Sequence, residues 1–168
     1  IMIEVLRHHS GVVARFSGPL IYLGGKRRPT HQTFDTIRSM KFSHKAKQLG
    51  IKHYDVNMGM MDFDVRFIIG DYKKSLELVE WFHEVKYYAE EPGDPPRGEM
   101  FYTPPFCAVI WLPHKPRTAD EHGTLAHECV HAVSRMFQWA SVPHDLSTDE
   151  PFAHAVGFLV RQFKEKVK

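Results

Sequence analysis

The chain has 168 residues, a formal net charge of +2 and a hydrophobic fraction of 43%, which predicts one domain, residues 1–168, with an apolar core. So mild a charge gives no reason to expect a nucleic-acid partner, and no apolar run approaches the ~18 residues of a membrane span. The N-terminal residues lack the features of a signal peptide, so we expect a cytoplasmic protein with no membrane partner. Cys107 and Cys129 have no partners for a disulfide framework, and their apolar neighbours predict buried free thiols.

The N-terminal part of the chain predicts three strands and two helices separated by turn residues. In chain order these are strands over 1–6 and 11–25, a helix from 30 to 50, a strand over 61–70 and a helix over 75–88. The segment 90–99 then holds three prolines and two glycines, so we expect a loop inside the same domain.

The C-terminal part predicts a strand and two helices. The apolar run "FCAVIWLP" at 106–113 is typical of a strand that ends at Pro113. Thr118 and Glu121 have the spacing of a capping box, which predicts a helix that begins there and continues to about Trp139. A second helix over 150–167 fills the C-terminus.

The first of these two helices carries the motif HExxH in "TLAHECVHAV". Residues four apart share one helical face, so His127 and His131 can both direct a ring nitrogen at one tetrahedral Zn²⁺. Glu128 lies about 100° around the helix, close enough to meet a metal-bound water. These residue types at this spacing predict a metal site with its own general base.

The surroundings of the motif favour a metal site over chance, which would produce HExxH in about one such chain in twenty. The flanking residues are apolar, and no other charge interrupts 124–133. Two imidazoles and a carboxylate in such a helix are costly to bury without a partner, and a metal ion satisfies all three. The alternative is a pair of neutral histidines that form hydrogen bonds within the core.

The motif and the helix that follows it resemble the zincin metallopeptidases over about 60 residues. The resemblance implies an α+β fold in which a small mixed sheet packs on helices, with an HExxH helix and a C-terminal helix that carries the third ligand. In the gluzincin branch that ligand is a glutamate about 20 residues on, and Glu150 in "STDEPFAHAVGFLV" fits. Glu150 also fits a second capping box with Ser147, so a structural role is the alternative. Asp149 is the reserve candidate for the third ligand, as in zincins that use aspartate.

The resemblance further implies zinc-dependent hydrolysis of peptide bonds, with Zn²⁺ held by His127, His131 and Glu150 and with Glu128 as the general base. His154 stands where gluzincins commonly have an aspartate, so it is a candidate supporting residue or oxyanion donor. Tyr102 is another candidate donor, and His122 and His144 also remain open. The substrate would be a peptide or a protein, whereas the oligomeric state is not predicted.

Two further features are similar to known metallopeptidases. Zincins bind substrate along an edge strand above the active-site helix, and we expect the strand 106–113 to be that edge, with a central position as the alternative. The order of strand, HExxH and C-terminal helix is also similar to short metallopeptidases encoded by tailed phages and prophages. The alternatives to a peptidase are an inactive binding or scaffold protein on the same frame, or a hydrolase of a non-protein amide.

Overall fold

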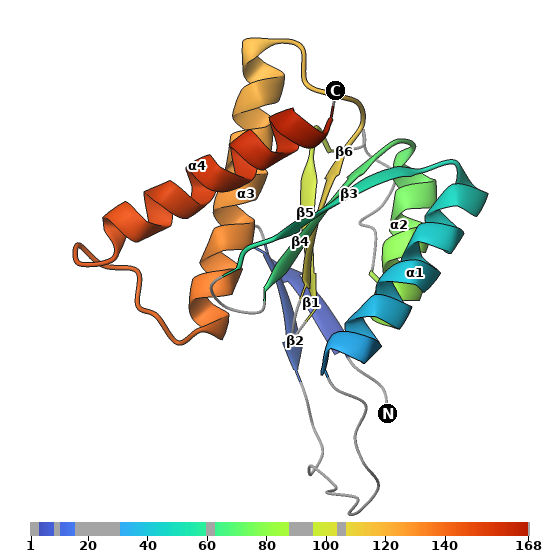
Figure 1. Ribbon diagram of the computed structural model, residues 1–168, viewed down its shortest axis with the longest axis horizontal. Coiled ribbons are helices and arrows are strands. Elements are labelled where there is room, and N and C mark those ends of the chain that lie inside the picture. Colours follow the sequence, from blue (N-terminus) through green and yellow to red (C-terminus); the bar gives the residue numbers. More distant parts are fainter. Residues whose placement is uncertain are drawn as a thin grey trace, which may run out of the picture.

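The computed structural model describes residues 4–8, 11–15, 31–59, 63–87, 96–103 and 107–167. Within these ranges the chain forms an α+β fold of four helices, a two-stranded hairpin and a mixed four-stranded sheet (Figure 1). The hairpin pairs β1 (Glu4–His8) with β2 (Gly11–Arg15) in antiparallel fashion. Both strands are predicted by the sequence, but the predicted continuation of the second, to residue 25, lies outside the described residues.

In the remaining elements, two pairs of consecutive strands each follow one helix, and two helices end the chain. These elements are α1 (His31–Leu49), β3 (Lys52–Asn57), β4 (Asp64–Ile69), α2 (Tyr72–His83), β5 (Glu99–Thr103), β6 (Cys107–Leu112), α3 (Ala119–Trp139) and α4 (Asp149–Lys166). The sheet has the order β3-β4-β6-β5, in which β4 and β6 are parallel and the other neighbours are antiparallel. None of the described helices is both long and apolar enough to cross a membrane.

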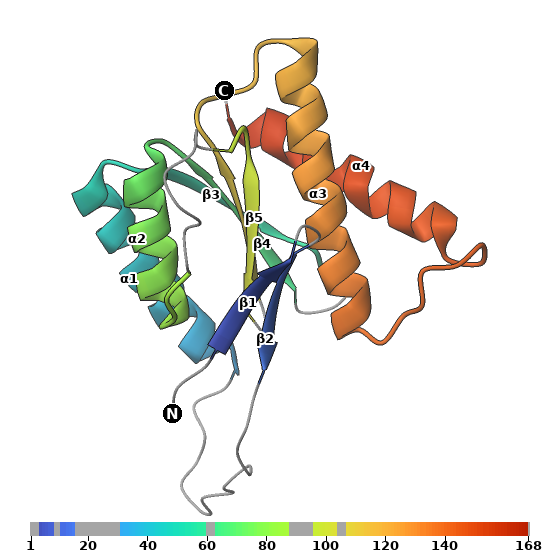
Figure 2. The same cartoon turned by 180° about the vertical axis from the view of Figure 1, so that it is seen from behind.

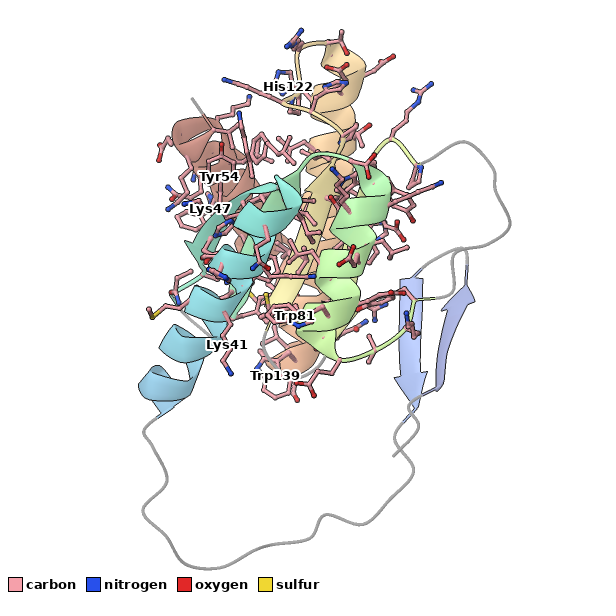
Figure 3. The ribbon with its side chains drawn as sticks, turned by 90° about the vertical axis from the view of Figure 1, so that its right-hand side faces the viewer. Lys41, Lys47, Tyr54, Trp81, His122 and Trp139 are labelled. Carbon is pink, nitrogen blue, oxygen red and sulfur yellow. The ribbon has the colours of Figure 1, made fainter. Side chains whose placement is uncertain are left out.

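The sheet has a layer of helices on each face. Figures 1 and 3 show α1 and α2 together on one face, and α3 with α4 on the other. The strands alternate accordingly: Val65 and Ile110 pack in the core below α3 and α4, whereas Ile68 and Trp111 pack in the core below α1 and α2. Because both faces are covered, β6 is apolar at nearly every position, as in a buried strand.

Two of the predictions about strands are wrong in ways that matter for the site. The strand 106–113, expected at an edge, is central as β6, because β4 pairs with one of its sides and β5 with the other. The edge beside α3 is β5, whose first residue, Glu99, falls in the segment predicted as a loop. The sequence prediction also omits β3, and it places α2 several residues too late along the chain.

The buried charge of Arg66 on β4 is held by Asp55 on the neighbouring strand β3. The Arg66 side chain is 7% exposed, and its Nη2 donates to Oδ2 of Asp55 at 2.9 Å. The guanidinium also lies over the ring of Phe42, 3.9 Å from its centroid. Burial opposes the ionisation of Asp55, but the hydrogen bonds and charge of Arg66 outweigh it, so the pKa of Asp55 lies below its usual 3.8.

Asp55→Asn is expected to lower the free energy of unfolding by about 1–2 kcal/mol at pH 7, because it leaves Arg66 buried without a carboxylate. Since the folded state lowers the pKa of Asp55, the contribution is complete above pH ~4 and is lost as the pH falls below it. Urea unfolding of both proteins between pH 7 and pH 3 measures the difference. A difference that stayed constant over this range would contradict the assigned ion pair.

Candidate active site

The helix α3 begins where its sequence predicts. The Thr118 side chain accepts a hydrogen bond from the Glu121 N–H, and the Glu121 carboxylate accepts one from the Thr118 N–H, which completes the capping box. Leu125, Cys129 and Ala132 then form part of the face that packs in the core. Cys129 is therefore a core residue, as predicted, and burial raises the pKa of its thiol to about 12. Because Leu125, Cys129 and Ala132 face the core, the residues between them lie on the flanks of the helix.

The two histidines of the motif converge on one face of α3. Their Nε2 atoms are 3.0 Å apart, and the rings are nearly perpendicular. Two nitrogens that ligate Zn²⁺ at 2.0–2.1 Å in tetrahedral geometry lie roughly 3.3 Å apart, so this separation is close to that of a metal-binding pair. Burial, followed by the charges of His127 and Arg135, lowers the pKa of His131, which favours the neutral form that binds metals.

Glu128 lies between the two histidines in the sequence and is only 7% exposed. Its carboxylate accepts a hydrogen bond from the backbone N–H of Met100 on β5. Burial, with the charge of Glu99 adding to it, raises the pKa of Glu128 to about 7 against the effect of this bond. The hydroxyl of Tyr72 donates to Oε2 of Glu99 at 2.8 Å. A cation at the histidine pair would favour the ionised form of Glu128.

The edge strand β5 runs alongside α3, as Figure 2 shows. The chain comes close to α3 at Gly98, immediately before the strand. A Cβ atom at this position would lie 2.7 Å from Cγ2 of Thr124 and 3.3 Å from Cγ of Glu128. The absence of a side chain at Gly98 thus lets the strand come near enough for the Met100 N–H to reach Glu128. The hairpin strand β2 also approaches β5, but it belongs to a separate sheet.

Gly98→Ala is expected to lower the free energy of unfolding by about 1–3 kcal/mol, because the added methyl group overlaps Thr124. Thr124 cannot easily turn away, since its Oγ1 donates to the carbonyl of Asp120 at 3.2 Å. Thermal or urea unfolding measures the loss. Thr124→Ser removes the overlapping methyl group and should restore most of the stability of the Gly98 variant.

Gly123→Ala is the matched control for this prediction. Gly123 lies in α3, and a Cβ atom there would have no neighbour within 4 Å. This change should stabilise the protein by about 0.5–1 kcal/mol, since alanine favours the helix. If Gly98→Ala were as harmless as Gly123→Ala, the close approach of β5 to α3 would be incorrect.

Tyr102, a predicted oxyanion donor, lies on β5 and faces α3. Its ring stacks on Phe63, and the guanidinium of Arg135 is 5.7 Å from the ring centroid. Burial raises the pKa of the Tyr102 hydroxyl, and the charge of Arg135 opposes the rise. The structure therefore places Tyr102 beside the Arg135 side chain, in the half of β5 that is farther from Gly98. Of the other predicted donors, His122 lies in the first turns of α3 (Figure 3).

Glu150 and His154 lie together at the start of α4, which crosses α3 in Figure 1. Their side chains are 86% and 81% exposed, and Oε2 of Glu150 is 3.5 Å from Nε2 of His154. The alternative role of Glu150 in a capping box with Ser147 is wrong. The N-cap is Thr148, without a side-chain hydrogen bond to the helix, and Ser147 donates to Asp145 instead.

The structure thus unites some of the predicted site residues but not all of them. His127 and His131 form a pair on α3, Glu128 of the same helix is bonded to β5, and Tyr102 of β5 lies near Arg135. In the part of the chain that the structure describes, no three His, Cys, Asp or Glu side chains form a group that could hold a metal ion. Glu150 is consequently not placed with the histidine pair.

Three residues of this region are absent from the sequence prediction, namely Gly98, Glu99 and Arg135. The first two lie at the start of β5, which the run of strand-forming residues "MFYT", two positions after a glycine, could have indicated. Arg135 follows His131 by four positions and so shares its helical face. It lies two residues beyond the stretch 124–133, in which Glu128 is the one Asp, Glu, Lys or Arg.

Comparison with protein-family models, curated proteins and solved structures found no match for this chain.

Proposed function

We propose that this protein is a zinc-dependent peptidase whose centre is the histidine pair of α3 with Glu128 as general base. The observation that carries the proposal is the 3.0 Å separation of the Nε2 atoms of His127 and His131, in a helix that also carries the buried Glu128. The lowered pKa of His131 favours the neutral imidazole that binds a metal ion, and the carboxylates of Glu128 and Glu99 add negative charge to the same region of the fold. A zincin-like fold is part of the same proposal.

The two histidines fit as metal ligands, and the proposed third protein ligand is Glu150. Its carboxylate is near His154 in the structure, so metal binding would require this side chain to leave His154 and approach the histidine pair. The role of Glu150 therefore rests on the resemblance of the sequence to gluzincins. His154 would support Glu150 through the contact that the two already make.

When bound, a zinc ion supplies a Lewis acid that acidifies water and polarises a carbonyl group. Glu128 would take a proton from the attacking water and deliver it to the leaving amine. Its hydrogen bond to the Met100 N–H holds the carboxylate against β5. The outer edge of β5 would bind the substrate in extended form through backbone hydrogen bonds, which suits a peptide or protein substrate.

The proposal is tested by incubating the zinc-loaded protein with a mixed peptide library and measuring the products by mass spectrometry. We expect cleavage at defined positions, which stops when a chelator removes the metal and returns when zinc is restored. Binding of zinc without any cleavage would favour an inactive binding protein or a hydrolase of other amides. Cleavage that a chelator did not affect would rule out the metal mechanism.

A further inference from the structure

Arg135 is a half-buried cation beside the proposed active site, and the side chains that contact it are neutral. Its Nη1 donates to Oε1 of Gln138 at 2.8 Å, and its guanidinium lies near the ring of Tyr102. Among the described residues it forms no ion pair with an acidic side chain. A guanidinium has five N–H donors in a planar fork, so most of its capacity to bind a carboxylate remains.

Arg135 lies where a peptide bound along β5 in the proposed manner would pass it. It follows His131 by four residues, so it lies one helical turn, about 5.4 Å, farther along the same face. Tyr102, its aromatic neighbour, belongs to the edge strand β5. An extended peptide advances about 3.3 Å per residue, so a peptide along β5 with its scissile bond at the histidines would pass Arg135 within roughly one to three residues of that bond.

We propose that Arg135, held beside Tyr102, is a specificity-determining residue that binds a carboxylate of the substrate. This rests on the proposed peptidase function and deepens it. The carboxylate is either the C-terminus of the peptide or the side chain of an Asp or Glu near the scissile bond. Gln138 and the Tyr102 ring hold the guanidinium in place without neutralising it, so the bidentate pair with a carboxylate would not have to displace another anion.

The test measures binding rather than turnover. Zinc-loaded protein with Glu128→Gln is immobilised and mixed with two random octapeptide libraries, one with free C-termini and one with amidated C-termini. Captured peptides are identified by mass spectrometry. Peptides with a carboxylate at one defined place should be enriched by on the order of ten-fold. Enrichment confined to free C-termini identifies the terminal carboxylate, and enrichment of Asp or Glu at one position in the amidated library identifies a side chain.

Added substitutions in the same background connect the preference to Arg135. Arg135→Met should abolish the enrichment, and Arg135→Lys should retain part of it because the charge remains but the fork is lost. Arg161→Met, at an exposed position on α4, changes the net charge equally and should have no effect. Circular dichroism confirms that each variant is folded.

The outcomes separate this inference from the function on which it rests. Absence of captured peptides, absence of a carboxylate preference, or a preference that survives Arg135→Met would each overturn the carboxylate site. A preference that depends on Arg135, in a protein whose wild type cleaves no peptide, would refute the peptidase but retain the site. Cleavage by the wild type without such a preference would refute the site alone.

Discussion

Glu128→Gln is expected to reduce peptide hydrolysis by about 10²–10⁴-fold while metal binding is retained. Glutamine cannot accept the proton of the attacking water at neutral pH. Its side-chain carbonyl can still accept the hydrogen bond that the Met100 N–H donates to Glu128, so the position of the side chain should persist. The measurement compares kcat/KM of the two proteins, with zinc affinity measured in parallel.

The fold should not suffer from this change, because the pKa of about 7 shows that the ionised form of Glu128 is unfavourable where it lies. Glu165→Gln, on the exposed surface of α4, is the matched control for the loss of one negative charge. Turnover by Glu128→Gln within a factor of two of the wild type would eliminate Glu128 as the general base.

His131→Ala should weaken zinc binding by at least on the order of 10²-fold. This loss of affinity is larger than the loss expected when a residue that only supports a ligand is removed. The reason is geometric: the Nε2 atoms of His127 and His131 are 3.0 Å apart, so the remaining histidine has no second nitrogen with which to share the ion. Competition with a chromogenic chelator gives the affinities. Glu150→Ala in the same assay determines whether Glu150 is a ligand.

His44→Ala is the control for the loss of one histidine. His44 is exposed on α1, where its Nε2 lies 3.0 Å from the side-chain nitrogen of Gln48, and it should contribute nothing to the tight site. If both alanine variants bound zinc equally well, the histidine pair would not be the metal centre.

Features encoded by neighbouring residues were predictable from the sequence. The capping box of Thr118 and Glu121 and the spacing of His127 and His131 each depend on residues that are three or four apart, so helical geometry alone brings them together. The helix α3 and the convergence of its two histidines follow from these local patterns.

Features that depend on long-range packing were not predictable in the same way. The position of β5 at the edge follows from its pairing with β6 and its contact with α3 at Gly98, and neither leaves a strong local signal in a strand of five residues. The central position of β6, in contrast, does leave a local signal in the sequence, because apolar residues on both faces are typical of a strand that is covered on both sides. The site of Glu150 depends on how α4 crosses α3.

The most direct measurement of the central claim is the metal content of the wild-type protein purified without added zinc. Elemental analysis should find close to one equivalent of zinc per chain, and a variant with both His127→Ala and His131→Ala should lose it. Less than about a third of an equivalent in the wild type, or an equal amount in the double variant, would contradict a catalytic zinc centre on α3.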